Sequence, residues 1–284
     1  METKGARNQE PEERALNNKT KSALLALLAL ALMTPGCGVV NSLRAKNSLN
    51  DGVREFNKGK YQLAEERFAR SLELNPDLTN AQLFYARALN AQFDQGLTDE
   101  LGRKTIGAYD DIISKNQDKP DAVDQALAFK ANIYSQLTRA NAERAAEYRA
   151  HQRETLEKRA TLSSATAKTK ADVYYTLGVG YWQESYDLNA SYVSHNKSVP
   201  PDILEKMKPL DKKAHEYLQK AISVDPNYAN AWFYEKLVYI EEMKYDPGRK
   251  DELTKRAMEM QDKYMTMQKQ QQQQAASEAA APSK

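Results

Sequence analysis

The sequence predicts an all-α protein, and two observations support this fold class. Only 11 of its 284 residues are glycine and 10 are proline, and the charged residues (28%) are interspersed with alanine, leucine and glutamine, which favour helices. In addition, segments 70–81 and 220–231 align without gaps: each ends a helical apolar pattern at Asn-Pro or Asp-Pro and continues with Asn-Ala. Because proline cannot continue a helix and restricts the preceding residue, each segment predicts a turn between two helices.

The charge balance and the cysteine count exclude two classes of protein. The 41 lysines and arginines against 39 acidic residues give a net charge of +2, which provides no field to attract nucleic acid. The single cysteine, Cys37, excludes an intramolecular disulfide framework. We therefore expect no nucleic-acid partner and no fold that depends on disulfide bonds.

The first 36 residues have the pattern of an export signal. A polar stretch ending in Lys19 and Lys21 precedes an apolar run, 22–33, and Gly36-Cys37 follows. This arrangement resembles the bacterial lipoprotein signal. The resemblance implies that Cys37 is the lipid-attachment residue, becomes the new N-terminus and holds the protein on a membrane. We expect residues 1–36 to be the signal peptide and 37–44 a tether.

Two other interpretations of this segment remain open. Residues 22–43 carry no charge and are just long enough for one transmembrane helix, although Pro35, Gly36 and Gly38 would interrupt it. Plain secretion after a cut near residues 29–31 is the other interpretation. All three export the body of the protein. We expect a lipid-anchored envelope protein that faces the periplasm. The lipoprotein resemblance implies the outer membrane, because Gly38 is not the aspartate that retains such lipoproteins at the inner membrane. A single-pass inner-membrane protein is the alternative.

The central part of the chain, 45–268, resembles the tetratricopeptide repeat (TPR), a 34-residue pair of antiparallel helices. The first unit carries the motif residues Gly52, Gly59, Tyr61, Ala64, Phe68, Ser71 and Pro76, and the fourth carries Tyr174, Leu177, Gly178 and Tyr181. The resemblance implies a right-handed α-solenoid of about five helix pairs, with units 45–78, 79–120, 121–170, 171–228 and 229–268. An unrelated helical bundle, which has the same apolar periodicity, is the alternative.

Two segments depart from the repeat pattern. The spacing in the fourth unit implies an insertion at 187–210, which contains Pro200-Pro201. After Gln268, the segment 269–284 consists of glutamines, alanines and other small or polar residues. Because it has no apolar residue larger than alanine, it cannot bury enough surface to offset the entropy of ordering, and we predict a disordered tail.

We predict no catalytic residue, cofactor or metal site. The three histidines (His151, His195 and His215) lack the i, i+4 histidine partner or the cysteine and aspartate cluster that a zinc site needs. His215 is expected to be an ordinary surface or half-buried histidine on an amphipathic helix. The run 139–170 has a net charge of +4 from eight basic and four acidic residues. It predicts a solvated face with pairs such as Glu154 with Lys158, or alternatively a patch for an acidic partner or lipid headgroups.

The TPR resemblance implies a concave groove, lined by the first helix of each pair, that binds peptides or proteins. The residues expected to face it are Leu83, Arg87, Asn90, Tyr175, Val179, Trp182, Phe233, Leu237 and Ile240. We therefore expect a non-enzymatic interaction scaffold that assists the assembly of envelope machinery. The alternative is a regulatory or enzyme-recruiting subunit with a ligand site formed by 187–210 and a single transmembrane helix.

Overall fold

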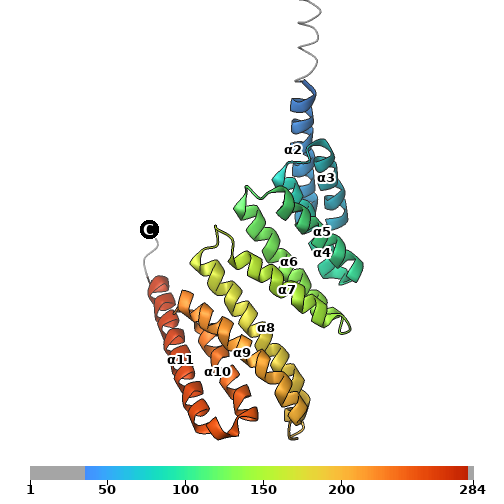
Figure 1. Ribbon diagram of the computed structural model, residues 1–284. Helices are drawn as coiled ribbons and strands as arrows, with labels where there is room; N and C mark the ends of the chain where they lie inside the picture. The colour runs from blue at the N-terminus through green and yellow to red at the C-terminus, as the bar shows by residue number, and fades with distance from the viewer. Residues whose placement is uncertain (1–35, 281–284) are drawn as a thin grey trace, which may run out of the picture. The chain divides into compact units, whose positions relative to one another are not determined.

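The computed structural model describes residues 36–280, and its regular structure in this range is helical, without a strand (Figure 1). This confirms the all-α prediction. The remaining residues, including nearly all of the expected signal peptide, lie outside the described range. The elements are α2 (Gly36–Asn57), α3 (Tyr61–Leu74), α4 (Thr79–Gly96), α5 (Asp99–Lys115), α6 (Pro120–Ala140), α7 (Ala145–Ala160), α8 (Ala167–Ser194), α9 (Pro201–Val224), α10 (Ala229–Tyr245), the 3-10 turn η1 (Pro247–Arg249) and α11 (Lys250–Ala280).

The described helices form five consecutive pairs, from α2 with α3 to α10 with α11, which agrees with the expected number of repeats. They are divided between two compact units, and the boundary, between Ala108 and Tyr109, falls inside α5. In the second unit, α8 packs against α7, α9 and α10, and α11 packs against α10. This order of contacts, in which each helix touches its neighbours in sequence, is that of a repeat protein.

In the first unit, α2 and α3 pack as the repeat motif predicts. Gly52 and Phe68 are buried, and a Cβ added at Gly52 would lie 2.6 Å from Cδ1 of the Phe68 ring. The Ser71 hydroxyl donates a 2.8 Å hydrogen bond to the backbone carbonyl of Ala45. Gly59, in the turn between the helices, has a φ of +73°, which favours glycine. The small residues of the motif are therefore required by close contact and by turn geometry.

The start of α2 includes the residues for which we expected a tether. Residues 37–44 are helical and continuous with the first repeat, and Ala45 is the first buried side chain in the described range. Extension of a helix that is already packed requires no new nucleus, so these residues can add turns to α2 at little cost. None of the described helices is long and apolar enough to cross a membrane.

In the second unit, α8 and α9 form a long hairpin packed around Gly178. A Cβ at this position would lie 2.6 Å from Cγ of Leu218 and 3.1 Å from its backbone nitrogen. The expected insertion, 187–210, is the tip of this hairpin: it contains the last two turns of α8, a short loop and the first turns of α9. Pro201 begins α9, a position where its missing N–H is not needed. The insertion therefore lengthens both helices.

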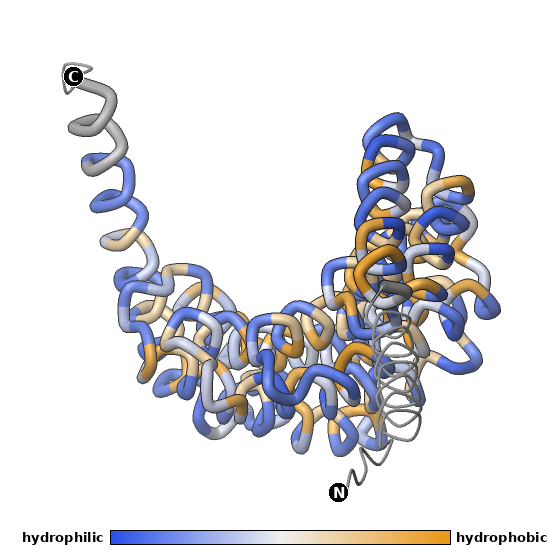
Figure 2. The backbone as a smooth tube through the Cα atoms, turned by 90° about the horizontal axis from the view of Figure 1, so that it is seen from above, coloured by the Kyte–Doolittle hydropathy of each residue, from blue (hydrophilic) through white to orange (hydrophobic). Residues whose placement is uncertain are grey.

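The end of α11 differs from the sequence expectation. The helix continues to Ala280, through most of the segment predicted to be disordered. Glutamine and alanine have good helix propensity, and they extend a helix that is already nucleated on α10. Residues 269–273 are exposed, and the hydrophilic last part of α11, blue in Figure 2, extends beyond the other helices of its unit.

Candidate partner-binding surface

A pocket of about 560 Å³ lies in the second unit between α6 and α8, with α7 as its third wall. This volume is within the range of about 300–1,000 Å³ that is typical of small-ligand pockets. Gly180 of α8 keeps one wall open, because a Cβ placed there would meet no atom within 4 Å. The lining residues are Ser135, Thr138, Arg139, Arg149, Gln152, Thr176, Val179, Gly180, Gln183, Glu184 and Asp187.

The pocket contains an arginine whose hydrogen-bonding capacity is only partly used. Nε of Arg149 is buried without a hydrogen-bond partner and lies 3.6 Å from Glu184 Oε2. The same carboxylate oxygen accepts a 2.5 Å hydrogen bond from Arg153, whose guanidinium also lies over the Tyr181 ring. Because Glu184 is held by Arg153, Arg149 can donate to an acceptor that enters the pocket.

An aromatic cluster adjoins the pocket at the crossing of α8 and α10. The Tyr175 ring packs 5.7 Å from Tyr234 and 5.0 Å from Tyr228, and Trp182 packs 5.0 Å from Tyr234. Burial raises the pKa of Tyr175 to about 12, and its hydroxyl, like that of an ordinary tyrosine, is protonated at neutral pH. Rigid, half-buried tyrosine and tryptophan rings are the side chains that anchor partners in many interfaces.

The structure brings some of the expected groove residues together. Val179 lines the pocket, and Tyr175 and Trp182 belong to the aromatic cluster beside it. Phe233 packs against Tyr264 of α11, the second helix of its own pair, with ring centroids 5.2 Å apart, and edge-on against Tyr234 at 5.5 Å. Leu237 is half-buried, and Ile240 is 40% exposed.

The three expected residues on α4 belong to the first unit. The Arg87 guanidinium lies over the rings of Phe56 and Phe84, at 5.6 and 5.4 Å from their centroids. Asn90 donates a 2.9 Å hydrogen bond to Asp94, and Leu83 is half-buried. On α4, the only exposed member of this set is therefore Arg87, and its cation is used to cover two rings.

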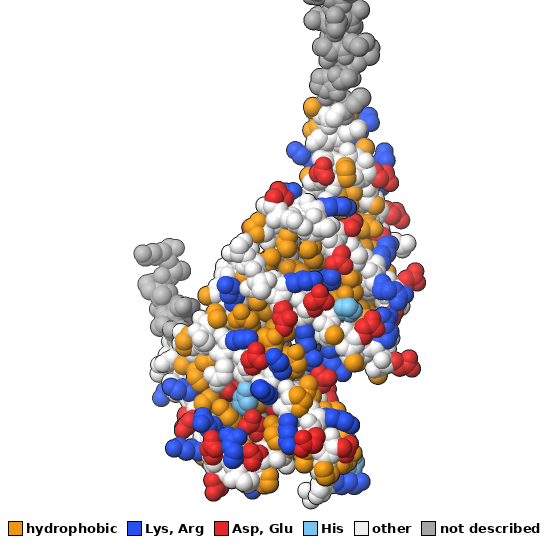
Figure 3. Space-filling model, in the orientation of Figure 1, with side chains coloured by type: hydrophobic (Ala, Val, Ile, Leu, Met, Phe, Trp, Pro, Cys, Tyr) orange, Lys and Arg blue, Asp and Glu red, His pale blue; other side chains and the backbone are white. Residues whose placement is uncertain are grey.

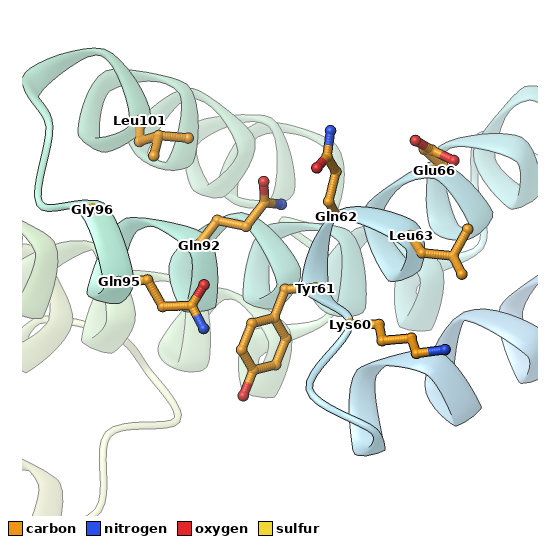
Figure 4. A pocket seen from close by; sticks show the side chains of 9 residues that line it. All are labelled: Lys60, Tyr61, Gln62, Leu63, Glu66, Gln92, Gln95, Gly96 and Leu101. Atoms are coloured by element: carbon orange, nitrogen blue, oxygen red, sulfur yellow. The ribbon is translucent and has the colours of Figure 1, made fainter.

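A second pocket, which the sequence did not indicate, lies within the first unit where α3 begins and α4 ends (Figure 4). It is an open hollow of about 760 Å³ lined by Lys60, Tyr61, Gln62, Leu63, Glu66, Gln92, Gln95, Gly96 and Leu101. Its amide side chains offer hydrogen-bond donors and acceptors. None of the expected groove residues lines it.

The interface of α9 with α10 contains a buried charged group that sequence reasoning missed. His215 Nδ1 lies 2.8 Å from Glu235, which is fully buried, and Nε2 lies 3.1 Å from Glu242. Burial alone would lower the pKa of His215, but its contacts with the two glutamates raise it to about 9. His215 is half-buried, as expected, but these contacts make it cationic at neutral pH, which the sequence did not indicate.

Further along the same interface, Asp211 is fully buried near Glu241. Burial raises the pKa of Asp211 to about 7, although the neighbouring Ser185 and Tyr245 hydroxyls oppose this shift. Lys244 donates to Glu241 at 2.6 Å and to Asn189 of α8 at 2.8 Å. The tip of the α8–α9 hairpin is thus attached to α10 through polar groups.

The basic run 139–170 is mostly ion-paired. Lys158 lies 2.8 Å from Glu154, as predicted, and Arg144 lies 2.8 Å from Glu147. Arg159 makes a bidentate contact with Asp124 at 2.8 and 3.0 Å. In Figure 3, basic and acidic side chains are interspersed over the face in view. Among the described residues, no group of three or more histidine, cysteine, aspartate and glutamate side chains is placed to hold a metal ion.

Comparison with known proteins gives structural relatives only. No protein-family model and no curated protein matches the sequence. The fold is similar to that of a MamA RS-1 double mutant, with a TM-score of 0.50 and 16% identity over 80% of this chain and 96% of that one. MamA from Desulfovibrio magneticus RS-1 (TM-score 0.49, 16% identity, 80% and 97%) and YrrB (TM-score 0.44, 13% identity, 78% and 84%) are also similar.

The helix pairs and the packed motif glycines define the chain as a helical-repeat protein, and the similarity to the MamA RS-1 double mutant agrees with this fold. Within that class it has the tetratricopeptide-repeat fold, because Gly52, Gly59 and Gly178 lie at the close helix contacts and the turn that the repeat motif requires. At such low identity the similarity concerns the fold.

Proposed function

We propose that this chain is a non-enzymatic scaffold that binds a protein or peptide partner at the α6–α8 pocket and the aromatic cluster next to it. The main support is that a pocket of about 560 Å³ with a partly unpaired arginine adjoins half-buried aromatic rings, so one extended segment can use both. The apolar rings supply anchoring area, and Arg149 supplies orientation. The TPR fold supports this role, because helix-repeat surfaces commonly bind extended segments.

In-cell photocrosslinking tests the partner site. A photoreactive residue at Gln183, an exposed pocket residue, should capture a partner, whereas one at Lys212, which is exposed on α9, should not. Gly180→Phe fills the open wall of the pocket, and Gly180→Ala is the matched control, since its Cβ meets no atom. Capture should persist in the alanine variant and disappear in the phenylalanine variant. The same captured proteins at Gln183 and Lys212 would argue against the site.

For its location, we propose a lipoprotein of the bacterial cell envelope, attached through Cys37 and involved in assembly of envelope machinery. The sequence pattern around Cys37 supports this; its side chain lies outside what the structure describes. The mass of the mature N-terminus is the direct test. A diacylated Cys37 is the expected result, and an intact Met1 or an unmodified Cys37 would refute it.

The alternative, a regulatory subunit with a ligand site at 187–210, is favoured by one observation: this hairpin tip contains a fully buried polar residue, Asn189, whose side chain bonds to Lys244 and Glu241 of α10. A variant with a shortened hairpin separates the two functions. If the scaffold proposal is right, capture from Gln183 survives. Loss of all capture in a folded variant would favour the alternative.

A further inference from the structure

The first turns of α2 carry an exposed apolar face. Val39, Val40 and Leu43 are 64%, 45% and 58% exposed, and they account for three of the large exposed apolar side chains in the described chain. Val39 and Leu43 are four residues apart and Val40 and Leu43 three, so the three side chains lie on one side of the helix. Orange side chains are visible in Figure 3 where the described part of α2 begins.

This apolar face does not serve the packing of the repeat. The α2 residues that pack toward α3 begin with Ala45, whose carbonyl accepts the Ser71 hydrogen bond, and continue with Leu49 and Gly52. The nine helical residues before Ala45 span about 13 Å at 1.5 Å per residue. An apolar face whose large side chains are exposed to this extent, on the end of a helix, indicates a binding surface.

The charges around the face specify what covers it. Arg44 and Lys46 are exposed directly after the apolar residues, and no acidic residue occurs between Arg14 and Asp51. Cys37, the proposed lipid-attachment residue, lies two residues before Val39. Apolar side chains that follow the attachment residue and precede basic ones match the order of acyl region and anionic headgroups at a bilayer surface.

We propose that the first turns of α2 are a membrane seat, in which Val39, Val40 and Leu43 enter the acyl–headgroup boundary of an anionic bilayer and Arg44 and Lys46 contact its headgroups. This inference rests on the proposed membrane attachment and adds to it. Because α2 is one continuous helix from Gly36 to Asn57, the first repeat is held directly against the membrane and not on a flexible tether.

Depth-dependent fluorescence quenching tests the membrane seat. The full chain, purified from expressing bacteria and reconstituted in phosphatidylcholine and phosphatidylglycerol vesicles, is compared with Leu43→Trp and with the matched control Asn50→Trp. Asn50 is also exposed on α2 but lies about 10 Å further along the helix. The native chain supplies the background from Trp182 and Trp232. Brominated lipid should reduce the added emission of Leu43→Trp by about twofold or more and leave that of Asn50→Trp nearly unchanged.

The other outcomes overturn the inference in distinguishable ways. If the chain sediments with vesicles but neither position is quenched, the membrane seat is wrong and attachment stands. If the emission wavelength of Leu43→Trp changes only with the number of protein molecules per vesicle and not with brominated lipid, the face binds a second copy of the chain. Equal quenching at both positions would mean that the helix enters beyond the proposed seat. A chain that does not sediment with vesicles overturns both the attachment and the seat.

Discussion

Two glycines of α8 that lie two residues apart, and therefore on different faces of the helix, should respond to the same substitution in opposite directions. In Gly178→Ala, the new Cβ would lie 2.6 Å from Leu218 Cγ and 3.1 Å from the Leu218 backbone nitrogen, well inside the usual contact distance of about 3.5 to 4 Å. Overpacking of a core typically costs about 1–3 kcal/mol, and the backbone contact places this case near the upper end. The better helix propensity of alanine returns about 1 kcal/mol.

Gly180→Ala gains the same helix propensity and meets no atom within 4 Å. We therefore expect Gly178→Ala to lose about 2 kcal/mol of unfolding free energy and Gly180→Ala to gain about 1 kcal/mol. Urea denaturation followed by tryptophan fluorescence measures this, because Trp182 on α8 and Trp232 on α10 both report on the second unit. Equal midpoints for the two variants, or a stabilised Gly178→Ala, would refute the packing argument.

The remaining predictions concern buried charge and the first repeat. Folded Asp211 holds a proton up to a pKa of about 7, above the ordinary 3.8, so the unfolding free energy should fall between pH 4 and 7 by up to about 4 kcal/mol. Asp211→Asn should remove this fall. If urea titrations at pH 5 and 8 give the variant the same difference in unfolding free energy as the native chain, the prediction is wrong. His215 stays protonated in the folded state between pH 6.5 and 9, so the unfolding free energy of the native chain should also fall as the pH rises through this range. His215→Gln should remove this second fall, measured by the same urea titrations. Gly52→Ala should destabilise the first unit by about 1–3 kcal/mol through its contact with Phe68, seen as faster amide exchange in α2; unchanged exchange would exclude that contact.

The repeat fold could be predicted because its signals are local. Gly52, Phe68 and Ser71 are spaced for one helix pair, and each side chain has a packing role that its size alone indicates. Pro76 and Pro226 predicted the positions of two turns between helices, because a proline cannot continue a helix and restricts the residue before it. The helical structure of 37–44 and 269–280 was not predicted. Their composition shows only that these segments cannot bury much surface, whereas a helix that is already packed can extend without burying any.

The candidate site was predicted in part. Tyr175, Val179 and Trp182 recur at i, i+4 and i+7 on one helix, so their common face was evident from spacing. Phe233 could not be assigned in the same way, because a residue on a first helix can face either the groove or its own second helix. Tyr234, which links the cluster to α10, and Arg149 on a second helix became visible only when the helices were placed together.

The buried charges were missed because a charged residue in an amphipathic pattern is normally assigned to the solvent side. A usable signal was present: Met207, Asp211, Ala214 and Leu218 follow the core spacing of α9, and all four are fully buried. Likewise, Glu235 follows Ala231 by four residues and precedes Val238 by three on α10. A charged residue among such core-facing positions indicates that it has a buried partner, but the sequence does not tell which residue of the facing helix that partner is.

The charged contacts between α9 and α10 also bear on how the last repeat finds its place. Neighbouring repeats present similar apolar faces, so a helix displaced by one turn would still bury hydrophobic surface. Such a displacement would break the contacts of the fully buried Glu235 with His215 and Gln219, and a buried carboxylate that loses its partners costs several kcal/mol. Apolar packing makes association of the two helices favourable, and these ionisable side chains select the one alignment in which the chain can complete its stack.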